Sequence, residues 1–165
     1  MLRLCYTSTG VTHRVCETAA FMSLEILEMV ERVAARAGFQ STIDEDEMRL
    51  VLAFDMGEGR RQMVFVRDTS VSPQHAVVTI FSPCLVVTKE LFRGISKNQA
   101  MELLRANATT HFARYGISET ESYTMVVASI DHLLAKLDPE EFEASVLSVA
   151  HAADSYEKKL GKDDF

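Results

Sequence analysis

LDPEEFEASVLSVAHAADSYEKKLG, residues 137–161, is the stretch that decides the fold. Asp138 is a suitable N-cap, Pro139 suits the first helical position, and Glu141 completes a D-x-x-E capping box. Gly161 is of the type that most often ends a helix. The apolar residues between these signals fall on one stripe, formed by Phe142, Val146, Val149, Ala153, Tyr156 and Leu160. The stretch therefore predicts a helix over residues 139–160 that lays this stripe on a core.

The two stretches before it predict a second helix and a β-hairpin. LLRANATTHFARYGIS (residues 103–118) runs from a helical pattern into a strand, and YTMVVASID (residues 123–131) supplies the returning strand. Ser96 and Gln99 form an S-x-x-Q capping box at the start of the helix. We expect the pairing of residues 112–118 with 123–130, and we expect four helical residues to face inward: Ala100, Leu103, Leu104 and Ala108.

The first half of the chain predicts one helix and three strands. The helix begins at Glu17 or Ser23 and ends at Ala37. Period-two patterns and β-branched residues predict strands over residues 48–54, 61–66 and 76–82. Pro83 closes the third strand, although residues 85–87 can extend the sheet. Because short turns join most strands, the sequence predicts an α+β fold with an antiparallel sheet, in the order α-β(3)-α-β(2)-α.

Length, charge and cysteine content limit the class of protein. The 165 residues correspond to one domain, and the net charge of −7 disfavours nucleic acid and anionic membrane surfaces as partners. No apolar run approaches the roughly 18 residues of a membrane helix. Cys5, Cys16 and Cys84 show no paired spacing, which favours a reducing compartment and a cytoplasmic location. We expect residues 1–22 to be a poorly ordered leader and residues 161–165 a frayed tail.

Metal ligands are not found at any metal-binding spacing. His13 lies near Cys16 in the sequence, and His75 and Cys84 could approach across a loop, but the chain contains no CxxC or HExxH. A calcium loop starting at Asp44 would place an arginine where its glycine belongs, so we reject it. The sequence therefore predicts no metal site.

Catalytic and phosphate-binding motifs are also absent from the sequence. There is no G-x-S-x-G, and Cys84 is better explained as a small core residue than as a nucleophile. Gly57 and Gly59 fit a hairpin turn rather than a phosphate loop. We predict no catalytic residues and no cofactor.

Three stretches carry a resemblance to a known family. They are GRRQMVFV (residues 59–66), LLRANATTHFARYGIS (residues 103–118) and LDPEEFEASVLSVAHAADSYEKKL (residues 137–160). In this order the chain resembles the bacterial YbjN-like proteins, which share the type III secretion chaperone-like fold. The resemblance covers residues 23–160 and implies one domain, often dimeric, without catalytic residues or cofactor. Chaperones of this fold hold extended segments of an exported protein, and YbjN-like proteins resemble regulatory modules. The extra N-terminal stretch is a departure from a secretion chaperone.

We therefore expect a non-enzymatic module that docks an extended segment of a protein client and forms a homodimer. The candidate contacts come from two places. An apolar sheet face that looks only partly covered contributes Val51, Ala53, Val64 and Val66. The turn contributes Arg60 and Arg61, which can dock an acidic partner or merely be exposed charges. The alternative is a small-ligand sensor with a cleft between sheet and helix. An enzyme is the third class considered.

Overall fold

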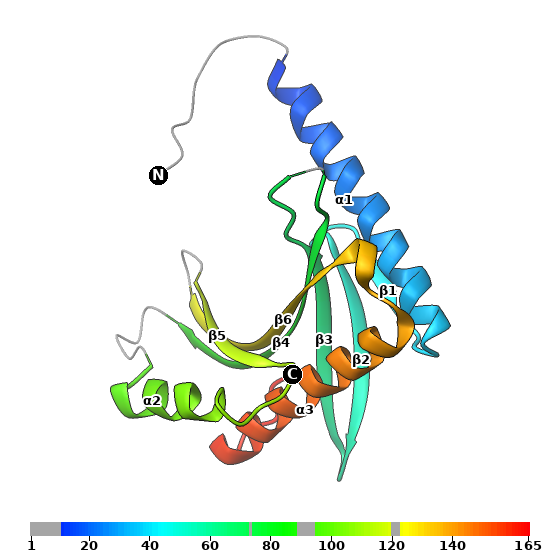
Figure 1. Cartoon of the computed structure of the whole chain (residues 1–165). Helices are drawn as coiled ribbons and strands as arrows, with labels where there is room; N and C mark the ends of the chain where they lie inside the picture. Colours follow the sequence, from blue (N-terminus) through cyan, green and yellow to red (C-terminus); the bar gives the residue numbers. More distant parts are fainter. Residues whose placement is uncertain (1–10, 73, 89–94, 120–122) are drawn as a thin grey trace.

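The computed structural model describes residues 11–72, 74–88, 95–119 and 123–165 (Figure 1). In chain order the elements are α1 (Val11–Arg36), β1 (Thr42–Asp44), β2 (Arg49–Gly57), β3 (Arg60–Asp68), β4 (Val77–Thr88), α2 (Lys97–Ala106), β5 (Arg114–Glu119), β6 (Tyr123–Leu133), the 3-10 turn η2 (Leu134–Lys136) and α3 (Pro139–Leu160). The strands form one six-stranded sheet in the order β1-β2-β3-β4-β6-β5, and every neighbouring pair is antiparallel. The predicted α+β class with an antiparallel sheet is confirmed.

The helix α3 forms over the predicted residues with the predicted N-cap and C-cap, but the Glu141 side chain does not complete the predicted capping box and lies 3.5 Å from His132 instead. The Asp138 side chain accepts a hydrogen bond from the Glu141 amide at 2.8 Å, and Gly161 ends the helix in the left-handed conformation at φ 66°. Phe142, Val146 and Val149 are fully buried. Local capping and periodicity therefore specify both the length of α3 and the stripe that it buries.

The core lies between one face of the sheet and the helices α1 and α3. On that face, which we call the inner face, Leu50 and Leu52 of β2 lie beside Val66 and Val64 of β3, and all four are at most 2% exposed. Val78 and Ile80 of β4 continue the inner face. Leu27, Val30 and Ala34 of α1 are fully buried in the same cluster. Figure 1 shows α3 crossing the sheet while α1 lies alongside, with its N-terminal turns reaching past the strands.

The opposite face of the sheet, which we call the outer face, carries the alternate residues of the same strands. Val51 lies opposite Phe65, Ala53 opposite Met63, and Phe65 opposite Phe81. None of these five side chains is buried. Within the described part of the chain, no helix covers this face.

The sheet differs from the sequence prediction in two places. The short strand β1 was not predicted, because three residues are too few to establish a period. The strand β4 does not end at Pro83, so that prediction is wrong, whereas the alternative that residues 85–87 extend the sheet is confirmed. The strand continues to Thr88 beside β6, with a register shift between Pro83 and Leu85. The hydrogen-bonded pairing between β3 and β4 involves residues 65–68 and 78–81 and ends before Pro83. Because β3 requires no amide hydrogen from residue 83, a proline is tolerated at this position.

The helix α2 confirms its predicted capping box, in which the Ser96 and Gln99 side chains bond reciprocally to main-chain amides. Only part of its predicted inward face is correct. Leu103 is buried, whereas Leu104 is 63% exposed, and Ala108 lies beyond the end of the helix. A helix of 10 residues packs with a narrow stripe, so neighbouring apolar residues cannot both reach the core.

Both chain ends differ from expectation. The helix α1 begins at Val11, inside the segment for which the sequence predicts a leader, whereas residues 1–10 lie outside the described residues. The tail after Gly161 is not frayed: the Arg60 guanidinium donates to the Lys162 carbonyl oxygen at 2.7 Å, and the Met63 amide donates to the main-chain oxygen of Phe165 at 3.2 Å. No described helix has the length and apolar composition needed to cross a membrane.

Candidate functional site

The outer face of the sheet carries a pair of phenylalanines under two arginines. The rings of Phe65 and Phe81 lie 5.5 Å apart, tilted by 36°. The Arg49 guanidinium lies 4.4 Å from the centroid of Phe65, and the Arg67 guanidinium 5.4 Å from that of Phe81. Each contact is within cation–π range. This part of the surface is therefore both apolar and positively charged.

Acidic residues of the β1–β2 turn hold these arginines in place. Arg49 pairs with Asp44 at 3.1 Å, and Arg67 pairs with Glu47 at 3.6 Å. Two residues of the acidic stretch at 44–47 thus orient the cations of the outer face. The Arg67–Glu47 pair is solvent-exposed and the Arg49–Asp44 pair is half-buried, so the first contributes little to stability and is the more easily exchanged for a partner's carboxylate.

Two hollows flank the phenylalanine pair. The first has a volume of about 220 Å³ and lies over β3, β4, β6 and β5; its lining is Arg67, Thr69, Thr79, Phe81, Ser118, Met125, Val127 and Ser129. The second, of about 810 Å³, lies between α1 and the β1 edge; its lining is Glu31, Arg32, Ala35, Phe39, Gln40, Ser41, Thr42, Val51, Ala53 and Met63. Val51 and Ala53, two predicted contact residues, therefore line the larger hollow. Together the hollows and the phenylalanine pair make the outer face an elongated apolar surface with polar margins.

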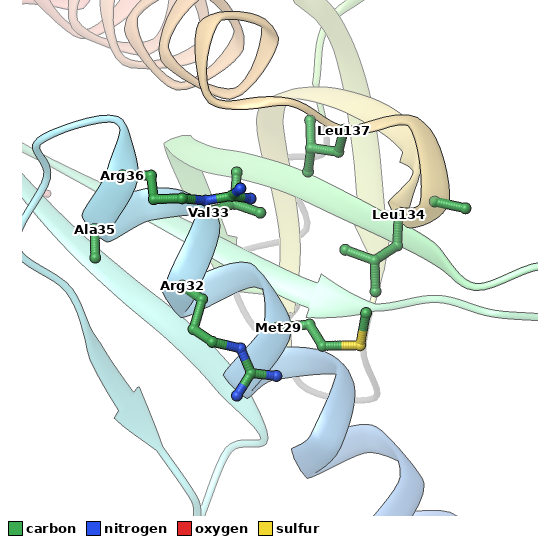
Figure 2. A pocket seen from close by; sticks show the side chains of 8 residues that line it. Met29, Arg32, Val33, Ala35, Arg36, Leu134 and Leu137 are labelled. Carbon is green, nitrogen blue, oxygen red and sulfur yellow. The ribbon is translucent and has the colours of Figure 1, made fainter.

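A further groove runs along the other flank of α1, between α1 and η2 (Figure 2). It measures about 700 Å³, and Figure 2 shows Met29 of α1 facing Leu134 of η2 across it. Arg32 lines both this groove and the larger hollow. Ala35 lines both as well, so the exposed flanks of α1 are continuous with the outer-face surface through these two residues.

Val64 and Val66 do not belong to this surface, so their prediction as contact residues is wrong. Both are fully buried on the inner face. A simple two-residue turn at Glu58 and Gly59 would place Ala53 opposite Val64, but a register shift between Asp55 and Gly57 places it opposite Met63 instead. One extra residue in a strand exchanges the faces of everything beyond it, which moves Val64 and Val66 into the core.

Arg60 is not a free turn charge either, so its prediction as a docking residue is wrong. Its side chain is 14% exposed, with Nε 2.6 Å from Asp154 Oδ1, Nη2 3.6 Å from Glu157 Oε2 and Nη1 3.6 Å from Asp163 Oδ1. The hydrogen bond with Asp154 raises the pKa of Arg60. Arg61, the next residue, is exposed and projects from the outer face with Met63 and Phe65. Arg60 therefore joins β3 to α3 and the tail, and only Arg61 remains available to a partner.

One carboxyl group in the cluster around Arg60, that of Glu157, is buried at an energetic cost to its charged form. Glu157 is fully buried, and burial raises its pKa above the ordinary value of 4.5, against the lowering effects of the Asp164 amide and of Arg60. A carboxyl group with a raised folded-state pKa favours folding when protonated. The contribution of protonated Glu157 to the free energy of unfolding is therefore fully present below pH 4.5 and is lost as the pH rises through the folded-state pKa.

Glu157→Gln should for this reason stabilise the protein at pH 8, because the amide keeps the shape of the protonated acid without a buried charge. We expect a rise in melting temperature of about 2–4 °C, the scale of a modest stabilisation in a chain of this size. The difference from the wild type should shrink toward pH 4. Thermal unfolding followed by circular dichroism between pH 4 and pH 8 measures it, and a Glu157→Gln protein that is less stable at every pH would contradict the assignment.

Cys84 is fully buried, and burial raises the pKa of its thiol to about 12. The group is therefore protonated at neutral pH and is a poor nucleophile. Burial likewise raises the pKa of Tyr115 to about 12, and its hydroxyl donates to the Ala152 carbonyl oxygen at 2.8 Å. These residues pack β4 and β5 against α3.

The structure assembles one constellation that sequence reasoning missed. His132 Nε2 lies 2.8 Å from Ser145 Oγ, and His132 Nδ1 lies 3.5 Å from Glu141 Oε1. The order of groups is that of a serine nucleophile, a base and an orienting acid. Ser145 is, however, fully buried within α3, so a substrate has no access to its hydroxyl. The three residues tie β6 to the first turns of α3, and only the spacing of Glu141 and Ser145 on one helical face hinted at a shared partner.

Three further histidines, His75, His111 and His151, lie at the surface. His111 and His151 are exposed and line a hollow of about 510 Å³ between α3 and the start of β5, with Thr110, Tyr115, Leu147, Ser148, Ala152 and Ser155. His75 is exposed in the loop before β4. Within the described ranges, no three histidine, cysteine or carboxylate side chains are grouped as metal ligands would be.

Comparison with known proteins finds no matching family model and no matching curated protein. The function is therefore inferred from the outer face.

Proposed function

We propose that this protein is a non-enzymatic binding module, chaperone-like or regulatory, that docks an extended acidic and apolar segment of a partner protein on the outer face. The observation that carries the proposal is the phenylalanine pair, Phe65 and Phe81, which no helix covers in the described structure and which lies beneath two arginines. An uncovered apolar surface of this kind marks an interaction site.

Charge supports the choice of an acidic partner. The chain as a whole carries −7, yet Arg49, Arg61 and Arg67 all project from the outer face of β2 and β3. Asp44 and Glu47 pair with Arg49 and Arg67, so a partner's carboxylates can bind these guanidinium groups in exchange for the intramolecular pairs, whereas a basic partner cannot. The order of helix, sheet and helix matches loosely the order that the YbjN-like and type III secretion chaperone-like resemblance implies. We add this resemblance to the outer-face argument and propose a chaperone-like role in the cytoplasm.

The binding test uses exposed residues. Ala53→Glu should weaken binding of an acidic, apolar peptide pool about tenfold or more, because it adds a carboxylate to the larger hollow without entering the core. Fluorescence anisotropy with two synthetic peptide pools of equal apolar content, one acidic and one basic, measures the effect. The acidic pool should bind more tightly, and its affinity should fall as salt rises from 50 to 300 mM.

Val71→Glu is the matched control, since Val71 is 95% exposed in the loop after β3 and adds the same charge elsewhere. It should bind the acidic pool like the wild type. Equal affinity for both pools, or an Ala53→Glu protein that binds normally, would refute docking on the outer face.

We also propose that the protein is a homodimer, with an interface at α2 and β5. Four of the seven large apolar side chains that are exposed in the described structure lie there, namely Met101, Leu104, Phe112 and Ile117. Phe112 has φ 63°, a costly conformation for an aromatic residue, and its ring is half exposed. The strand β5 is an edge of the sheet, and the Asn107 side chain bonds to the main chain of Tyr115, leaving Ile117 at the uncovered part.

Light scattering at micromolar concentration should give about twice the chain mass of 18.4 kDa. Leu104→Glu combined with Ile117→Glu should give the monomer mass, because both side chains lie in the proposed interface. Val71→Glu should remain dimeric. A wild-type protein that is monomeric at high concentration would contradict the dimer and leave the outer-face proposal intact.

The second candidate function is a small-ligand sensor. It is favoured by the hollow between α3 and β5, where His111, His151 and the hydroxyls of Ser148 and Ser155 converge beside Tyr115. A ligand bound there should raise the melting temperature of the wild type and not that of His151→Ala. A thermal-shift screen of small metabolites distinguishes this role from protein binding.

A further inference from the structure

The N-terminal half of β3, residues 60–64, does not pair with β4. Pairing between β3 and β4 extends from Asp68 with Val78 to Phe65 with Phe81, and residues 60–64 of β3 have no described partner strand on that side. Figure 1 shows β2 and β3 running on together while β4, β6 and β5 curve away. We call this opening, between residues 60–64 of β3 and the part of β4 after Phe81, the wedge.

The chain's own tail occupies the wedge. The Met63 amide donates to the main-chain oxygen of Phe165 at 3.2 Å, and the Ser82 hydroxyl donates to the Met63 carbonyl oxygen. The Arg60 guanidinium donates to the Lys162 carbonyl oxygen and lies 3.6 Å from the Asp163 carboxylate. The tail is thus held to β3 by one main-chain bond, and its own main chain also bonds to the side chains of Arg60 and Glu157. One ion pair, between Arg60 and Asp163, adds to these bonds.

The tail leaves some buried polar atoms near the wedge without a hydrogen-bond partner. Of the five buried side-chain polar atoms without a hydrogen-bond partner in the described structure, four lie in residues 60–64 of β3 or in the last turns of α3: Arg60 Nη2, Gln62 Oε1, Tyr156 Oη and Glu157 Oε2. Two of these, Arg60 Nη2 and Glu157 Oε2, lie 3.6 Å from each other as an ion pair, so Gln62 Oε1 and Tyr156 Oη are the atoms without any polar partner among them. Gln62 is fully buried and spans the wedge, since its amide nitrogen donates to Ser82 Oγ and to the Pro83 carbonyl oxygen. Unpaired buried donors and acceptors are rare in folded proteins. A second peptide backbone supplies both an N–H for Gln62 and a carbonyl oxygen for Arg60.

We propose that the wedge is a strand-binding site for an extended segment of a partner protein with an acidic residue close before an aromatic one, and that residues 162–165 occupy it as an internal competitor. The tail, Lys162-Asp163-Asp164-Phe165, defines this chemistry because it is the occupant that the site already accepts. Strand addition draws its affinity from the main chain and its specificity from alternate side chains. The proposal rests on protein binding as the proposed function, but its site is separate from the outer face.

The test releases the tail without altering the wedge. Gly161 has φ 66° and no atom within 4 Å of an added Cβ, so Gly161→Val misdirects the tail through backbone strain alone. Gly38→Val is the matched control, because Gly38 has φ 85° just after α1, away from the wedge. The probe is a labelled, capped peptide with the sequence of residues 161–165, and a version with both aspartates replaced by lysine is its control.

The peptide should bind Gly161→Val at least about tenfold more tightly than the wild type, in which the tethered tail competes at an effective concentration near millimolar. Gly38→Val should bind it like the wild type, and the lysine peptide should bind no variant. Exchange of the Met63 amide should be faster in Gly161→Val and slow again when the peptide is added. Equal affinity of wild type and Gly161→Val, or peptide binding that leaves Met63 exchange unchanged, would overturn the proposal.

Two further variants keep the outcome interpretable. Asp163→Ala removes the ion pair to Arg60 without backbone strain, and should raise peptide affinity in the same direction even if Gly161→Val fails to fold. Val71→Glu, placed in the Gly161→Val background, adds a charge on an exposed loop outside the wedge and the outer face, and should leave peptide affinity unchanged. Met63 amide exchange reports on the wedge, whereas the peptide pools report on the outer face, so failure of one proposal is distinguishable from failure of the other.

Discussion

Val146→Asp should unfold the protein or cost about 4–5 kcal/mol of the free energy of unfolding. Val146 is fully buried where α3 meets the sheet, so the new carboxylate would lie among apolar side chains without a partner. Since domains are stable by only about 5–15 kcal/mol, one such change consumes most of the margin. Urea denaturation followed by circular dichroism measures it.

Ser155→Asp is the control for this change, because it places the same residue on the exposed side of the same helix. It should alter stability by about 0.5 kcal/mol or less, with a small unfavourable contribution from the helix dipole. A Val146→Asp protein as stable as Ser155→Asp would mean that the apolar stripe of α3 does not face the sheet.

Val64→Glu should be nearly as destructive, at about 3–5 kcal/mol, although the sequence predicts Val64 as a partner contact on a partly covered sheet face. Val64 lies opposite Leu52 on the inner face and is fully buried. A glutamate there must either bury an unpaired charge or force the strand out of register.

Ala53→Glu is the direct comparison, since Ala53 is exposed on the outer face of the neighbouring strand. It should leave the free energy of unfolding within about 1 kcal/mol of the wild type. The same urea titration compares the two variants. If both fold equally well, the register assigned to the β2–β3 hairpin is wrong.

The local elements of this protein were predictable from sequence because their signals are local. The capping residues Asp138 and Ser96 and the terminal glycine of α3 act within a turn or two of the chain. The β5–β6 hairpin was equally visible, because β-formers flank a short turn on both sides. Element type and antiparallel pairing follow from such patterns.

The outer face was only half predictable. Val51 and Ala53 lie on the outer face, as predicted. Val64 and Val66 were assigned to the same face but are buried on the inner face. All four residues are apolar, so composition does not reveal which of them face the core. The deciding event is the register shift between Asp55 and Gly57, and a bulge of one residue leaves no reliable mark in a single sequence. The phenylalanine pair, Phe65 with Phe81, was missed for the same reason.

What the sequence determined by itself is therefore the three α-helices and five of the six described strands, through caps, periodicity and turns that act over a few residues. Only the tertiary structure decided the rest: the pairing of Arg60 with Asp154, which lie 94 residues apart, the contact of His132 with Ser145, and the position of the tail at Met63. The physical reason is that these contacts depend on register and on how the sheet opens, which are set by the packing of the whole core and not by any local stretch of the chain.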